Sequence, residues 1–183
     1  GIGAFVKPGQ SVLIKPNLLS DHAPDEAVTT HPEVVRALIR ILKDHGVKPS
    51  VADSPASVVK IEKVWDKTGF AALCKEENVP LLSLEKTGAQ TFETDGCSFS
   101  IAKPVLEADV VISVCKVKSH ALTRLTAAVK NVYGFLPGYQ KAMQHKMHPS
   151  PVEFSVLLSA ICRTAPPTLN IADAVWGMEG EGP

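Results

Sequence analysis

Between Val110 and Pro149 the chain carries six cationic side chains and three histidines, but no aspartate or glutamate. Surface helices usually mix both signs of charge, so a run without counter-ions suits an anionic ligand such as a carboxylate, a phosphate or an acidic cofactor. Docking of an acidic protein or of RNA, and a plain solvated face, are the alternatives. The charged residues of this basic segment are Lys116, Lys118, Arg124, Lys130, Lys141 and Lys146, and its histidines are His120, His145 and His148.

Within the basic segment, His120 is the candidate acid–base residue, because an imidazole with the ordinary pKa of about 6.5 carries protons well at neutral pH. Residues 126–131 predict the start of a short helix, whose first amide groups would add to anion binding beside Lys130 and Asn131. His145 and His148 stand three positions apart and could hold a metal from one helix face.

Polar residues also follow the predicted strands at the points where these strands end. Because ligands of open α/β sheets bind at the carboxyl ends of the strands, these side chains should meet at one edge. We expect Lys15, Asn17, Ser54, Lys116, Lys118 and Asn131 to hold the anion, and Asp53 and Asp173 to position a divalent metal or orient His120.

The elements that position these residues alternate between short apolar runs and helical periodicity. Strands are predicted at 12–14, 50–52, 80–84, 110–114 and 169–173, the fourth apolar enough to be covered on both faces. Thr30 and Glu33 match a capping box that starts a helix ending near Gly46. Further helical segments are predicted at 58–78, with a break near Gly69, and at 103–108, 122–134 and 151–163. The alternation predicts one α/β domain over 1–183 with an open, mostly parallel sheet.

Residues 87–102 differ from this alternation. Two polar–apolar runs flank Asp95-Gly96, a pair that favours a tight turn, so a β-hairpin is predicted here. We interpret it as a small insertion into the α/β domain.

Composition excludes several classes of protein. With 183 residues and 45% apolar residues, the chain can bury roughly 70% of its unfolded surface, and disorder is excluded. Nineteen basic against nineteen acidic residues argue against a general nucleic-acid binder, and no apolar run approaches the ~18 residues of a membrane span. Phosphate-binding P-loop, dinucleotide-binding and nucleophile-elbow motifs are absent.

The cysteines and the chain ends give weaker expectations. Cys74, Cys97, Cys115 and Cys162 show no C-x-x-C spacing, so four reduced thiols in a cytoplasmic protein are expected. The chain begins at Gly1 without a leader and stops in a glycine-rich stretch, which suggests a fragment of a longer protein.

Five motifs carry a family resemblance. In order they are Ile14-Lys15-Pro16-Asn17, residues 30–36 (THPEVVR), Ala52-Asp53-Ser54-Pro55, residues 107–120 (EADVVISVCKVKSH) and residues 128–134 (AVKNVYG). With Asp173 and residues 177–180 (GMEG), the chain resembles domain-of-unknown-function family 362 over its whole length. The resemblance implies association with an iron–sulfur enzyme, whose cluster would lie outside this chain.

A second similarity is to the nickel-pincer lactate racemase family, in the succession of a strand, a Lys- and His-bearing loop, Thr126-x-x-x-Lys130 and Pro137-Gly138. It implies His120 as acid–base residue, Lys130 as the cofactor attachment point, and His145 or His148 on the metal side.

Three functions are therefore open. The leading hypothesis is a cytoplasmic domain that binds an anionic substrate or cofactor, with or without a metal, inside a larger redox- or metal-associated enzyme. The alternatives are a non-catalytic module that docks an acidic partner through the basic segment, and a racemase-like isomerase.

Overall fold

The computed structural model describes residues 1–55, 60–180 and 182. Its main sheet has the strand order β3-β2-β1-β6-β7, and β8 lies alongside β6. All neighbours are parallel except the β6–β7 pair. The predicted open, mostly parallel α/β sheet is thus confirmed. Its strands are β1 (Ser11–Lys15), β2 (Lys48–Asp53), β3 (Leu81–Ser83), β6 (Val110–His120), β7 (Arg124–Thr126) and β8 (Leu169–Met178).

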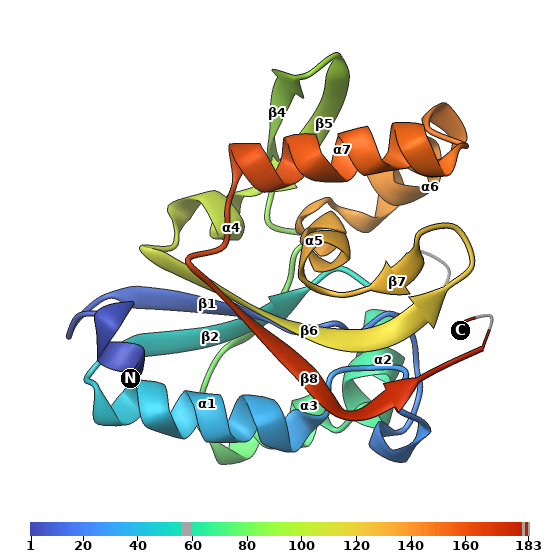
Figure 1. Ribbon diagram of the computed structural model, residues 1–183. Helices are drawn as coiled ribbons and strands as arrows, with labels where there is room; N and C mark the ends of the chain where they lie inside the picture. The colour runs from blue at the N-terminus through green and yellow to red at the C-terminus, as the bar shows by residue number, and fades with distance from the viewer. Residues whose placement is uncertain (56–59, 181, 183) are drawn as a thin grey trace.

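Helices cover both faces of this sheet (Figure 1). One face is covered by α1 (Pro32–Asp44), α2 (Ile61–Lys67) and α3 (Phe70–Glu76). The other carries α4 (Lys103–Glu107), α5 (Ala128–Asn131), α6 (Gly138–Met147) and α7 (Pro151–Thr164). Three short 3-10 turns complete the described elements: η1 (Ile2–Ala4), η2 (Pro24–Glu26) and η3 (Val132–Phe135).

The side chains of each strand point alternately to the two faces of the sheet and so contribute to two separate hydrophobic cores. In β1, Val12 and Ile14 pack with the α1 layer, whereas Leu13 packs with the α7 layer. Because successive side chains of a strand point to opposite faces, Lys15 continues on the α7 side. In β6, Val110, Ile112 and Val114 face α1, so Lys116 faces α1 as well. The sheet therefore separates the polar residues at its carboxyl edge into two groups.

The hairpin consists of β4 (Ala89–Thr94) and β5 (Cys97–Ala102). Its turn is the predicted Asp95-Gly96 pair, with φ of 54° and 75°. Both residues adopt the left-handed region, which explains the preference for this pair. Phe99 and Ile101 are fully buried in the α7-side core, so the hairpin is a structural part of that core.

The start of α1 differs from the prediction. The side chain at the helix N-cap is that of His31, whose Nδ1 accepts a hydrogen bond from the Glu33 amide at 3.2 Å. The Thr30 hydroxyl is used elsewhere: it donates to the Val114 carbonyl at 2.8 Å and accepts from the Asn17 amide at 2.8 Å. A capping box was thus the wrong interpretation, because Thr30 ties the loop after β1 to β6.

Other boundaries also differ. The predicted break at Gly69 is present, with φ of 79°, while the predicted helix start near Val58 lies outside the described residues. Residues 122–134 form β7, α5 and η3 rather than one helix, since β7 folds back to pair with the end of β6. β6 and β8 extend to His120 and Met178, beyond the predicted strands, because the end of β6 pairs with both β8 and β7.

Candidate functional site

A pocket of about 240 Å³, here called the carboxyl-edge pocket, lies on the α7 side where β1 and β2 end. The end of β6, α5, η3 and α6 close its other sides. Most of its polar lining comes from residues that the sequence singled out. The lining consists of Lys15, Asn17, Leu19, Asp53, Ser54, His120, Lys130, Asn131, Tyr133, Gly134, Lys141, Ala142 and His145.

The base of this pocket is an ion pair between Lys15 and Asp53, with Nζ and Oδ1 2.7 Å apart. Lys15 is 1% exposed, and its ammonium group also donates to Asn131 Oδ1 at 3.0 Å. Asp53 accepts further hydrogen bonds from the amides of Leu18 and Ser54, at 2.8 and 2.9 Å. Both oxygens of Asp53 therefore already have donors, and this carboxylate neutralises one lysine.

Two more lysines line the pocket, and within the described residues neither forms an ion pair. Burial, together with repulsion from Lys15, lowers the pKa of Lys130 to about 8. Burial likewise lowers the pKa of Lys141 to about 7, where the Asp53 charge opposes the shift. The Lys141 ammonium donates to the Ser54 carbonyl. The pocket thus holds more cationic than anionic groups.

His120 reaches the pocket from the end of β6. Its Nδ1 accepts from the amides of Leu122 and Thr123 at 3.1 and 3.2 Å, so the neutral ring carries its hydrogen on Nε2. Burial and the nearby Lys130 lower the pKa of His120 to about 4. This shift favours the uncharged ring at neutral pH, with the Nε2 hydrogen available to a ligand.

Aromatic rings form one wall of the carboxyl-edge pocket. His145 stacks on Phe154 with ring centroids 4.5 Å apart and meets the Tyr133 ring edge-on at 5.2 Å. The Lys130 ammonium lies over the Tyr133 ring, 4.9 Å from its centroid. Burial lowers the pKa of His145, so this imidazole too is biased toward its neutral form. The wall orients Lys130 without neutralising it.

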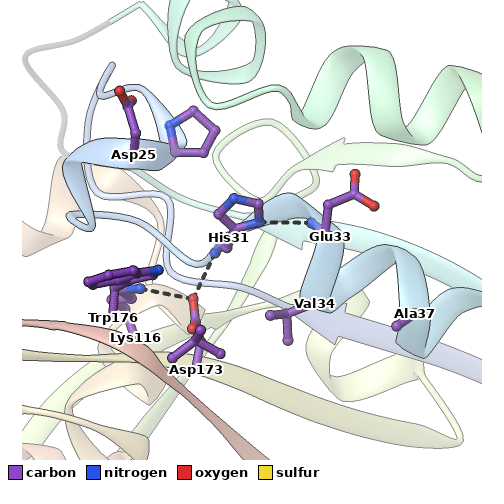
Figure 2. A pocket seen from close by; sticks show the side chains of 10 residues that line it. Asp25, His31, Glu33, Val34, Ala37, Lys116, Asp173 and Trp176 are labelled. Carbon is purple, nitrogen blue, oxygen red and sulfur yellow. Dashed lines mark hydrogen bonds and ion pairs between the residues drawn. The ribbon is translucent and has the colours of Figure 1, made fainter.

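The expected single cluster is divided between the two faces of the sheet. Lys116 and Asp173 form a buried ion pair of 3.0 Å on the α1 side (Figure 2). They line a separate hollow of about 880 Å³, here called the α1–β8 groove. Lys118 joins neither hollow: it is 2% exposed and donates to the Val28 carbonyl at 2.7 Å. The groove is lined by Pro24, Asp25, His31, Glu33, Val34, Ala37, Lys116, Asp173, Val175 and Trp176.

The predicted metal ligands are not brought together. Asp53 and Asp173 each pair with a different lysine, and His148 lies just beyond the end of α6. Among the described residues no three His, Cys, Asp or Glu side chains gather around a point where a metal could sit. In the part of the chain that the structure describes, Asp53, Asp173, His145 and His148 therefore do not form a common metal-ligand cluster. The four cysteines are unpaired thiols, and Cys74, Cys97 and Cys115 are buried.

Sequence reasoning missed three important residues. Lys141 was counted among the cations but not assigned to the pocket, although it follows the Pro137-Gly138 turn in a segment without acids. Gly134 was part of a motif, yet its close approach to Lys15 depends on tertiary packing. Nothing in the sequence indicated that Trp176 would line a groove.

Comparisons with solved structures show the same fold in larger proteins. The lactate racemase apoprotein of Thermoanaerobacterium thermosaccharolyticum is 13% identical with a TM-score of 0.58, over 93% of this chain and 44% of that chain. A protein from Thermotoga maritima is 14% identical with a TM-score of 0.53, over 91% of this chain and 46% of that one. At these identities the likeness concerns the fold.

A curated relative is more similar in sequence. The thylakoid-associated protein sll1697 of Synechocystis is 37% identical over all of this chain, which spans 57% of the relative's length. No helix in the described part of the chain is both long and apolar enough to cross a bilayer. The family named Domain of unknown function (DUF362) matches residues 12–183, and the expected resemblance is thereby confirmed. The chain belongs to this family.

Proposed function

We propose that the carboxyl-edge pocket binds a small anion, either a carboxylate or a phosphate-like oxyanion. The observation that carries the proposal is the pair Lys130 and Lys141, which are half-buried and line the pocket together with Lys15, without an acidic partner of their own in the described residues. Asp53 is already shared by Lys15 and two amides. A bound anion would supply the missing negative charge and relieve repulsion among the lysines.

Neutral donors support the same ligand. The Ser54 hydroxyl lines the pocket, is buried and has no hydrogen-bond partner among the described residues. His120, which also lines the pocket, has its Nε2 hydrogen available to a ligand, since its Nδ1 is occupied. Buried polar groups are normally satisfied, so an acceptor is the natural partner for both. A volume of about 240 Å³ is below the usual range of drug-sized sites, which favours a ligand of few atoms.

Lys130 is the residue best suited to chemistry on this ligand. With a pKa of about 8, its amine can gain or lose a proton close to neutral pH, and a larger fraction of it is in the neutral, nucleophilic form than for an ordinary lysine. His120 would stabilise developing negative charge by hydrogen bonding. We infer an acid–base role for Lys130 within a larger enzyme, and no step of this proposal involves a metal.

The proposal is tested by titrating inorganic phosphate and, separately, lactate into the protein by calorimetry. Lys130→Gln and Lys141→Gln should each weaken binding of the preferred anion by about tenfold or more, since each removes a charge-assisted contact. Lys146→Gln is the matched control, because Lys146 is exposed on the same helix as Lys141.

The two ligands separate the two anion classes. Binding of lactate alone identifies a carboxylate site, and binding of phosphate alone an oxyanion site. Failure of both to bind at millimolar concentration, or equal weakening by Lys146→Gln, would show that the pocket is not an anion site.

A further inference from the structure

The α1–β8 groove lies on the opposite face of the sheet from the anion pocket and differs from it in charge. Three carboxylates line it, those of Asp25, Glu33 and Asp173, against the single ammonium group of Lys116. Glu33 also pairs with Arg36, which is outside the lining, whereas Asp25 forms no ion pair with any described residue. At about 880 Å³ the groove is large enough for an organic molecule.

The floor of the groove is a buried carboxylate with an unused acceptor. Asp173 Oδ2 accepts from Lys116 at 3.0 Å and from the His31 amide at 2.8 Å (Figure 2). Asp173 Oδ1 is equally buried, and no donor reaches it from the described residues. Leaving such an oxygen unsatisfied is costly, so a donor from a bound ligand would be favoured there.

The wall of the groove is apolar and aromatic. Trp176 and Val175 on β8 are 75% and 77% exposed, opposite Val34 and Ala37 of α1. An indole face exposed beside carboxylates attracts organic cations, because the ring presents negative charge on its face. An aliphatic or aromatic ligand body would cover these side chains and remove them from water.

We propose that the α1–β8 groove binds an organic cation, a primary amine carried on an apolar or aromatic body. The amine would be held by Asp25 and directed toward Asp173, and the body would pack against Trp176 and α1. This second ligand is of opposite charge to the anion proposed above and enters from the other face of the sheet. The inference does not depend on the anion pocket.

Three ring compounds that differ in one group test this proposal: benzylamine, benzyl alcohol and benzoate, each measured by equilibrium dialysis at pH 7. Benzylamine should bind about tenfold more tightly than benzyl alcohol, and benzoate should not bind measurably. Asp25→Asn should weaken benzylamine binding by about threefold to tenfold. Trp176→Leu, which keeps an apolar side chain but removes the ring, should weaken it by about threefold.

Asp21→Asn is the matched control for charge, because Asp21 is exposed in the same loop but does not line the groove. Both Asp25 and Trp176 are exposed, so neither substitution threatens the fold. Equal binding of the amine and the alcohol, absence of benzylamine binding at millimolar concentration, or equal effects of Asp21→Asn and Asp25→Asn would each overturn the proposal.

Discussion

At the scale of single residues, the pocket lysines are held in an environment that disfavours their charge. The pKa values of Lys130 and Lys141, about 8 and about 7, lie below the ordinary lysine value because burial removes water from the ammonium groups. Between the pKa of such a lysine in the folded protein and its ordinary pKa of about 10.5, the unfolded chain binds more protons than the folded one. The free energy of unfolding therefore increases as the pH rises through this range. The anion-free protein should accordingly gain stability between about pH 7 and 10.

Anion binding should show the opposite dependence on pH. A bound anion favours the protonated lysines, so binding takes up protons near pH 8, and affinity falls as the pH rises from 6 to 9. Calorimetry in two buffers of different ionisation enthalpy measures the protons taken up. Lys141→Gln should reduce this uptake, and Lys146→Gln should not. An uptake of zero at pH 8 would contradict the proposed role of these lysines.

Gly134 shows that the pocket depends on a close approach of backbone to side chain. A Cβ atom at this position would stand 2.5 Å from Lys15 Nζ and 2.8 Å from Asp53 Oδ1. Gly134→Ala should therefore displace the ion pair at the base of the pocket, lower stability by about 2 kcal/mol and abolish anion binding. Thermal unfolding and the phosphate or lactate titration measure the two effects.

Gly138→Ala is the control for this substitution. There the added Cβ would meet the carboxylate of Glu85, an exposed and flexible side chain that can rotate away. Anion binding should survive Gly138→Ala. Retention of full binding in Gly134→Ala would mean that Lys15 and Asp53 do not form part of the site.

At the scale of the elements, the hairpin is the part whose role differs most from the expected one. Phe99 is 2% exposed and contributes to the same core as Phe154 of α7. Phe99→Ala should lower the free energy of unfolding by about 3–5 kcal/mol, as truncation of a buried aromatic ring does. Phe92→Ala, on the partner strand and only partly buried, should cost clearly less. Chemical denaturation measures both; equal small losses would mean that the hairpin is peripheral.

The elements that could be predicted were those with a strong local signal. Val110 to Val114 are apolar apart from Ser113, and the Asp95-Gly96 turn needs two left-handed residues, so strand and hairpin followed from the sequence. The choice of His31 as N-cap could not, because Thr30 is bonded to Val114, which is distant in the chain. The extension of β6 to His120 could not either, because it depends on pairing with β7 and β8. The same holds for the site. The site residues could be predicted because they follow the ends of strands. Their division could not be predicted, because Lys15 and Lys116 point to opposite faces of the sheet and so line different hollows.

At the scale of the whole molecule, the fold places most cations of the basic segment away from the exposed surface. Lys116 and Lys118 are 2% exposed, and Lys130 and Lys141 line the pocket. Of its six cations, Arg124 and Lys146 are the two fully exposed ones. A segment with most of its charge turned inward is a poor docking surface for an acidic protein or RNA, whose binding requires many exposed cations.

Because few of these cations are exposed, an experiment can distinguish anion binding in the pocket from docking of an acidic partner on the surface. Poly-L-glutamate should show no measurable binding at 0.15 M salt, where exposed charges farther apart than about 8 Å are largely screened from each other. The double substitution Arg124→Gln with Lys146→Gln removes the exposed cations of the segment, and it should leave phosphate or lactate affinity within about twofold of the unchanged protein. Tight polyglutamate binding that this double variant abolishes would instead favour the docking function. Of the other four cations, Lys116 and Lys118 are buried and Lys130 and Lys141 line the pocket, which is the physical reason to expect the first result.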